Sequence, residues 1–202
     1  MTGPAVRPAV RAGRGEVRRR QILQAAVRVI GTGGLAAVTH RAVADAAGVP
    51  LGSTTYYFTD REDLVRQTMA HAVEIEAARM SAVVAGAAEG EPTVDGSVEL
   101  LTAIFLDKSV ADPLYDLALF EMFLEATRNP AVRAQTKAWS ALIAQIVDRV
   151  LPPTVAEVPR AVVVQVVAAL IDGLMLEAAS NRALGVPELS ADLRVVVERF
   201  AA

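Results

Sequence analysis

A cluster of hydroxyl and aromatic side chains lies in the stretch "AGVPLGSTTYYFTDREDL", residues 47–64. Ser53, Thr54 and Thr55 follow one another directly, although such residues compete for backbone hydrogen bonds and are poor formers of a core helix. Small hydroxyl side chains can approach a polar partner closely and bond to phosphate oxygens or to base edges. The stretch therefore predicts a surface that contacts a polar partner.

The other residue types that carry chemistry form no catalytic or metal-binding pattern. Glu121 and Glu125 lie one helical turn apart, but no histidine follows at the Glu-x-x-His spacing of di-iron bundles, and His40 and His71 are the only histidines. The chain has no cysteine, which excludes disulfides and thiolate sites. It also has no Gly-rich phosphate loop after a strand and no Ser-His-Asp candidate. We therefore expect a protein that is not an enzyme, with no cofactor and no metal.

Two short helices must position the hydroxyl cluster. Thr39 is the expected N-cap of a helix over 40–47, and Gly48 is its C-terminal breaker. A second short helix is predicted over 51–57. Two such helices joined by a Gly-containing turn are a helix-turn-helix arrangement, whose second helix lies in the major groove of DNA.

Longer helices flank this pair on both sides. A first helix is predicted from Arg18 to Thr32, where "GTGG" stops it. A fourth helix begins after a new N-cap, Thr59 or Asp60, and continues towards residue 88. Within the second short helix we expect Tyr56 and Phe58 to anchor the helix to its own core.

The charge of the chain is divided unevenly. Residues 1–66 hold ten Arg and five acids, a net charge of +5, and since the whole chain carries −3 the remainder carries −8. This division is expected when only the first segment meets a polyanion, although a basic tail on an ordinary domain would also produce it. Arg41 and Arg61, at helix starts, can reach phosphates. Residues 1–16 are predicted to be a flexible basic tail with three solvated arginines, Arg7, Arg11 and Arg14.

Residues 18–65 resemble the N-terminal DNA-binding domain of the tetracycline-repressor (TetR) family of bacterial transcriptional regulators. The matching pieces, in order and spacing, are "ILQAA", Gly34 with Leu35, Thr39 with Arg41, "VADAAGV", "YYF" and "REDL". Carried over by position, the resemblance implies DNA contacts at Thr39, His40, Arg41, Leu51, Gly52, Ser53, Thr55, Tyr57 and Arg61.

The remaining two thirds of the chain are predicted to be helical, with no strand signal and no internal repeat. Breaks at "EGEP", "DP", "NP", "LPP" and "LGVP" separate helices expected over 95–109, 112–127, 130–151, 158–183 and 188–200. We therefore predict an all-α protein of about nine helices. Its three-helix DNA-binding domain spans 17–62, and a helical ligand-binding and dimerisation domain spans 63–202.

The helix over 158–183 is apolar on all sides, so it must be buried on all sides. Its outer face has small and apolar residues spaced 4, 3, 4 and 3, and we expect this face in a homodimer interface: Val162, Val166, Ala169, Gly173 and Leu176. The TetR resemblance also implies dimers, while the alternative is a central core helix. The longest apolar run, 161–171, contains Gln165 and ends at Asp172, short of the roughly 20 residues of a membrane span. We expect a soluble, cytoplasmic protein with no membrane partner.

Aromatic and sulfur-containing side chains are spread over the helices that would surround a pocket. Those expected to bind a small-molecule effector are Phe105, Tyr115, Phe120, Phe123, Trp139 and Met175. The predicted function is a sequence-specific transcriptional regulator, a repressor that an effector releases from a palindromic operator. The alternative is a helical ligand-binding or scaffold dimer that no longer binds DNA.

Overall fold

The structure is a computed structural model that describes residues 9–87, 90–106, 113–181 and 185–202. Within these ranges it contains nine α-helices and no β-strand, so the predicted all-α fold is confirmed. The nine are α1 (Ala9–Gly33), α2 (His40–Ala47), α3 (Leu51–Tyr57), α4 (Arg61–Ala85), α5 (Val94–Leu101), α6 (Pro113–Ala126), α7 (Arg133–Val150), α8 (Arg160–Ser180) and α9 (Val186–Phe200). Shorter 3-10 turns occupy Leu35–Ala37 and Pro130–Val132, and a π-helix, Thr102–Leu106, continues α5.

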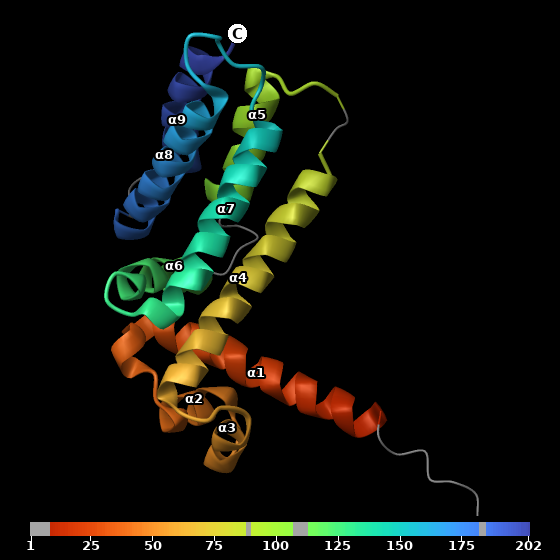
Figure 1. Cartoon of the computed structure of the whole chain (residues 1–202), viewed down its shortest axis with the longest axis vertical. Helices are drawn as coiled ribbons and strands as arrows, with labels where there is room; N and C mark the ends of the chain where they lie inside the picture. The colour runs from red at the N-terminus through yellow and green to blue at the C-terminus, as the bar shows by residue number, and fades with distance from the viewer. Residues whose placement is uncertain (1–8, 88–89, 107–112, 182–184) are drawn as a thin grey trace, which may run out of the picture.

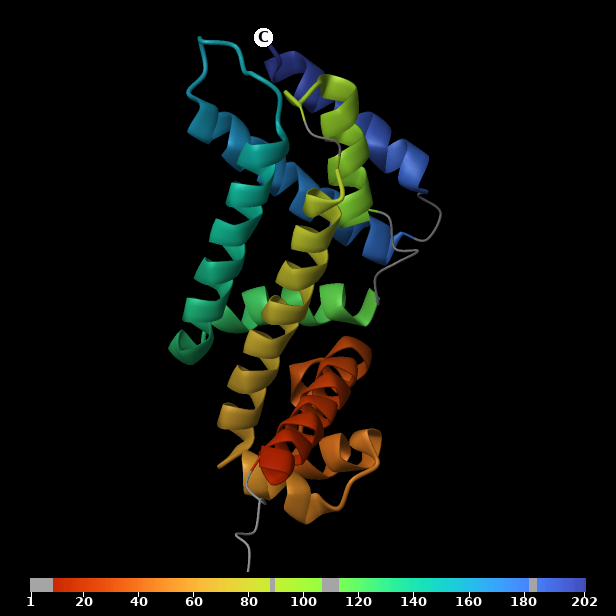
Figure 2. The same ribbon diagram turned by 90° about the vertical axis from the view of Figure 1, so that its right-hand side faces the viewer.

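The helices form two groups joined by α4. Helices α1 to α3 and the first half of α4 make a small bundle, which we call the head, and α5 to α9 make a larger bundle, the body (Figure 1). Helix α4 starts beside α2 and α3 and runs along the body (Figure 2). It is therefore one element through which a change in the body can reach the head.

Local caps fix the ends of the short helices. The Thr39 side chain accepts a hydrogen bond from the Ala42 amide at 3.0 Å, and Gly48 ends α2 in the left-handed region at φ 63°. Of the two candidate caps for α4, Asp60 is the one used, because its carboxylate accepts from the Asp63 amide at 2.8 Å. Both short helices have the predicted bounds.

The head has a continuous apolar core. Ile22 and Ala26 of α1, Val43 of α2 and Leu64 of α4 are all buried, and Phe58 at the end of α3 is fully buried among them. Phe58 was predicted to anchor α3, and its burial agrees. Truncating a fully buried Phe costs about 3–5 kcal/mol, so this residue contributes a large share of the head's stability.

The first helix begins earlier than predicted. We expected residues 1–16 to be a flexible tail, but α1 is already helical from Ala9. Ala and Arg are strong helix formers, and Glu16 pairs with Arg20 one turn later at 3.3 Å. These preferences outweigh the two glycines in the segment. Arg7 lies outside the described residues.

Candidate DNA-binding surface and effector site

The outward face of α3 is formed by small and apolar residues. Gly52 and Thr55 are exposed, Ser53 is half-buried, and Leu51 is 48% exposed. A Cβ atom added to Gly52 would meet nothing within 4 Å, so the surface above it is open. The structure therefore leaves four of the predicted DNA contacts on α3 at least partly exposed.

Thr54 has a different role from its two hydroxyl neighbours. Its side chain is fully buried, and its hydroxyl donates to the Leu51 carbonyl at 2.8 Å or to the His40 carbonyl at 3.3 Å. The second contact joins α3 to the first residue of α2. One of the three consecutive hydroxyls thus holds the two short helices together, while Ser53 and Thr55 remain at the surface.

The expectation for Tyr56 was wrong. We predicted that Tyr56 would anchor α3 to the core, but it is 81% exposed and its ring packs edge-on against Tyr57 at 5.0 Å. The half-buried residue is Tyr57, whose hydroxyl lies 3.6 Å from where a Cβ of Gly15 in α1 would stand. A seven-residue helix has too few apolar positions to fix which side faces inward. Tyr56 is therefore a candidate DNA contact that the sequence analysis missed.

The start of α2 adds a basic group beside this face. Arg41 is exposed and has no hydrogen bond or ion pair within the described part of the chain. Thr39 is exposed too, although its hydroxyl caps α2. His40 is half-buried, and its Nδ1 is buried without a hydrogen-bond partner among the described residues. Arg41 is thus the group at this helix end that is available to a phosphate.

Arg61 does not point away from the head as a phosphate contact would. Its Nε donates to the Val38 carbonyl at 2.8 Å, and its Nη2 donates to the Leu35 carbonyl at 2.6 Å. Both bonds close the loop between α1 and α2 onto the start of α4. The structure therefore gives Arg61 a positioning role within the head.

The same loop also contacts the body. The Glu121 carboxylate of α6 accepts a hydrogen bond from the Leu35 amide at 3.4 Å. Nearby, a Cβ atom at Gly31 would lie 2.7 to 2.9 Å from the backbone and Cβ of Leu114, which is closer than side-chain atoms approach. Helices α1 and α6 thus cross in backbone contact, and the head has a second connection to the body besides α4.

The six predicted effector residues belong to the interior of the body. Phe105, Tyr115, Trp139 and Met175 are buried, and Phe120 and Phe123 are partly buried against the same core. A hollow of about 890 Å³ lies elsewhere, where the end of α4 meets α5 and the end of α7. It is lined by residues that include Val83, Gly86, Glu91, Glu99, Leu100 and Arg149. None of the six lines this hollow.

The predicted interface residues lie together on the outer face of α8. Val162 is 45% exposed, Val166 is 40% exposed and Leu176 is 54% exposed, and Ala169 and Gly173 between them are exposed too. The opposite face of the helix is buried in the body: Val163, Val167, Ile171 and Leu174.

Helix α8 is also long and apolar enough to cross a membrane, with a mean hydropathy of 2.0 over its most apolar window. Only 33% of that window is buried. Asp172 lies beside this outer face, and desolvation raises the pKa of its carboxyl above the usual value. The helix therefore has one face that the described part of the chain leaves uncovered.

Two family descriptions match this chain over most of its length. Residues 22–68 match the tetR family of bacterial regulatory proteins, and residues 92–202 match the tetracycline repressor-like C-terminal domain. The nicotine-responsive transcriptional repressor HdnoR of Paenarthrobacter nicotinovorans is 29% identical over 113 residues. That match spans 56% of this chain and 56% of HdnoR, so it covers only about half of the relative.

Solved structures agree over a longer range. A TetR-family member of Streptomyces coelicolor A3, SCO1917, is 28% identical with a TM-score of 0.66, covering 90% of this chain and 96% of its own. The multidrug binding protein EbrR, solved with ethidium, is 29% identical with a TM-score of 0.66, covering 90% of this chain and 97% of its own. The chain belongs to the TetR family of bacterial transcriptional regulators.

Proposed function

We propose that this protein is a sequence-specific transcriptional repressor that binds a palindromic operator as a homodimer and is released by a small-molecule effector. The outward face of α3 carries the proposal, because it presents small, hydroxyl and aromatic side chains beside the unpaired Arg41. Side chains of this kind suit contacts with phosphates and with base edges in the major groove. The net charge of +5 over residues 1–66 agrees with a polyanionic partner.

A second copy of the chain is the proposed partner of the outer face of α8. An isologous interface pairs the same patch on both subunits, and Ala169 and Gly173 allow two such helices to approach closely. A lipid partner is disfavoured because Arg160, at the start of α8, pairs with Asp148 at 2.7 Å and donates to the carbonyls that follow α7. These contacts fix α8 to the body as part of one helical bundle. We accordingly place the protein in the cytoplasm.

Two heads in such a dimer would occupy successive major grooves, about 34–36 Å apart along DNA. Selection from random duplexes tests this directly, and we expect an inverted repeat to be enriched. Arg41→Ala should weaken binding to all sequences and lower the salt slope by about one. Substitution of Ser53 or Thr55 should instead change the preferred sequence. Enrichment of no inverted repeat would contradict the repressor proposal.

The hollow at the far end of α4 is the proposed effector site. Two carboxylates, Glu91 and Glu99, and one guanidinium, Arg149, line it, and the chain beyond residue 66 carries a net −8. Both features favour an organic molecule with a cationic group. EbrR, which resembles this chain over most of its length, was solved with ethidium.

Helix α4 would carry the effector signal to the head. The buried Glu76 pairs with Arg79 at 2.8 Å, and Arg79 donates to the Ile104 carbonyl at 2.9 Å, which ties the middle of α4 to the π-helix. A ligand that displaces the end of α4 therefore pivots it about this tie. A 100-fold loss of operator affinity requires about 2.7 kcal/mol of coupling, and operator DNA must weaken ligand binding by the same factor.

Ethidium fluorescence provides the effector test. We expect ethidium to bind saturably, and we expect both Glu99→Gln and operator DNA to lower its affinity. Trp139 is the only tryptophan and belongs to the buried set predicted from the sequence. If ethidium quenches the fluorescence of Trp139 and Glu99→Gln does not weaken ethidium binding, the buried set is favoured over the hollow as the effector site.

The alternative is a helical ligand-binding or scaffold dimer that no longer binds DNA. The accessible hydroxyls of α3 and the unpaired Arg41 favour the repressor. A dimer that binds ethidium but enriches no duplex would instead support the alternative. We propose no catalytic activity for either form.

A further inference from the structure

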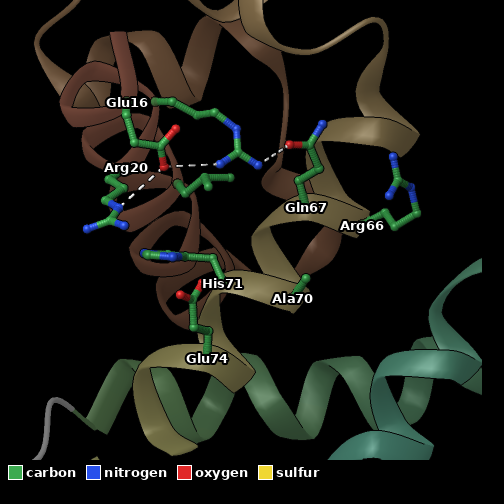
Figure 3. Close-up of a pocket in the computed structure, with 9 residues that line it drawn as sticks. Glu16, Arg20, Arg66, Gln67, Ala70, His71 and Glu74 are labelled. Atoms are coloured by element: carbon green, nitrogen blue, oxygen red, sulfur yellow. Dashed lines mark hydrogen bonds and ion pairs between the residues drawn. The ribbon is translucent and has the colours of Figure 1, made fainter. Parts of the chain in front are cut away.

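A second hollow, of about 390 Å³, lies within the head between α1 and the first half of α4 (Figure 3). It is near the opposite end of α4 from the proposed effector site. Its lining comes from both helices: Glu16, Arg19, Arg20 and Leu23 of α1, and Arg66, Gln67, Ala70, His71 and Glu74 of α4. The DNA-binding and dimer roles proposed above use none of these side chains.

Some of these charged groups are already paired. The Glu16 carboxylate accepts from Arg19 Nη1 at 3.5 Å and from Arg20 Nε at 3.3 Å. Arg19 Nη2 also donates to the Gln67 side-chain oxygen at 2.6 Å. Glu16 is therefore committed to two arginines of its own helix, and Arg19 joins α1 to α4.

Two oppositely charged groups keep atoms that bond to nothing else in the described part of the chain. Arg66 pairs with Asp63, but the terminal nitrogens of Arg20 and the carboxylate of Glu74 have no partner within the described ranges. Arg20 is on α1 and Glu74 is on α4. The hollow thus offers the terminal nitrogens of Arg20, whose Nε is paired with Glu16, and the unpaired carboxylate of Glu74, from different helices.

A buried imidazole lies between these two charges. His71 is only 5% exposed, and its Nε2 is buried with no hydrogen-bond partner among the described residues. Figure 3 shows its ring between Arg20 and Glu74. Burial lowers the pKa of His71; Glu74 and Glu16 oppose this effect, and Arg19 and Arg20 add to it. A neutral imidazole has one donor and one acceptor to offer a ligand, and an unpaired buried polar atom is costly.

We propose that this hollow binds a small zwitterion of the amino-acid type, with its carboxylate on Arg20, its ammonium group on Glu74 and its chain against His71. Three guanidiniums are balanced by Glu16, Glu74 and Asp63, so the surroundings favour a ligand without net charge. A simple anion would meet Glu74, and a simple cation would meet the arginines. The described His, Asp and Glu side chains include no group of three that could hold a metal ion.

A bound zwitterion would link α1 to α4 inside the head. Its effect on operator affinity rests on the proposed repressor function, whereas binding itself does not. The two are therefore measured separately, first on the free protein and then with duplex DNA.

The chain has only two histidines, which makes the binding test specific. Imidazole ¹H–¹⁵N spectra of the full-length protein are recorded with glycine, γ-aminobutyrate and 6-aminohexanoate, which differ in the spacing of their charges. Acetate and methylammonium, at matched ionic strength, represent the carboxylate half and the ammonium half of such a zwitterion. We expect at least one zwitterion to shift His71 saturably and to leave His40 unmoved. Its Kd should be at least about tenfold lower than that of either half.

Substitutions identify the residues responsible. Arg20→Ala and Glu74→Gln should each weaken zwitterion binding about tenfold, since each removes one charge-assisted contact. Arg18→Ala and Glu62→Gln are matched controls on the same helices, exposed and outside the hollow, and should bind as the parent does. Thermal melts establish that all four variants fold. Equal binding by all four variants, or halves that bind as tightly as the best zwitterion, would overturn the proposal.

Discussion

Arg61 provides a sharp test of how the head is held together. Its guanidinium bonds to two carbonyls of the loop between α1 and α2, those of Leu35 and Val38, at 2.6 and 2.8 Å. Hydrogen bonds from a charged donor contribute about 1.5–3 kcal/mol each, and the partial exposure of Arg61 favours the lower end. We therefore expect Arg61→Ala to destabilise the head by about 2 to 3 kcal/mol.

Arg61→Lys separates this role from a phosphate contact. Lysine keeps the positive charge but cannot donate from two fixed nitrogens in a fork. If Arg61 positions the loop, Arg61→Lys should lose stability nearly as Arg61→Ala does, and operator affinity should fall in both while the salt slope stays unchanged.

The measurements are thermal or urea unfolding and the salt dependence of operator binding. A phosphate contact would instead lower the salt slope by about one in Arg61→Ala and leave stability near the parental value. Arg41→Ala is the matched control, because Arg41 makes no contact of this kind in the described part of the head. If Arg61 and Arg41 variants behave alike in both assays, the positioning role is refuted.

Three further outcomes are expected. A Cβ at Gly173 would meet nothing within 4 Å in its own subunit, so Gly173→Arg should leave the subunit folded but give monomers by sedimentation. The control variant Ala141→Arg, at an exposed position of α7, should stay dimeric. A dimeric Gly173→Arg would remove α8 from the interface. Tyr56→Ala should weaken operator binding at least about tenfold without changing the melting temperature, and unchanged affinity would exclude Tyr56 from the DNA surface. Because burial lowers the pKa of His71 in the folded head, the unfolded chain takes up its proton first as pH falls. Stability should drop below about pH 6.5, by up to about 1.4 kcal/mol per pH unit, and His71→Gln should abolish this slope.

Features set by neighbouring residues were predictable from the sequence, and features set by tertiary contacts were not. Thr39, Gly48 and the acids after Asp60 mark helix ends through local hydrogen bonds and backbone conformation, so the bounds of α2 and α3 followed directly. The spacing of small and apolar residues at 4, 3, 4 and 3 also identified the exposed face of α8, because residues at this spacing lie on one side of a helix.

One error, the flexible tail expected over residues 1–16, concerns helix propensity, whereas the orientations of the tyrosines and of Arg61 concern side-chain direction. Tyr56 and Tyr57 are adjacent and identical in type, and the packing of α3 against α1 near Gly15 determines that Tyr57 turns inward. Arg61 begins a helix as a phosphate contact would, but its partners are carbonyls 23 and 26 residues earlier. The two hollows likewise depend on how α1, α5 and α7 pack against α4, which no local pattern encodes.

The backbone contact between Gly31 and Leu114 limits how such regulators can be recombined. A chimera that joins the head of another family member to this body must keep a residue without a side chain at position 31. Even Ala would place its Cβ 2.7 Å from the Leu114 carbonyl oxygen, and overpacking of this kind typically costs about 1–3 kcal/mol. This body therefore accepts only heads whose first helix can cross α6 this closely, and position 31 is the first residue to match when designing an operator swap.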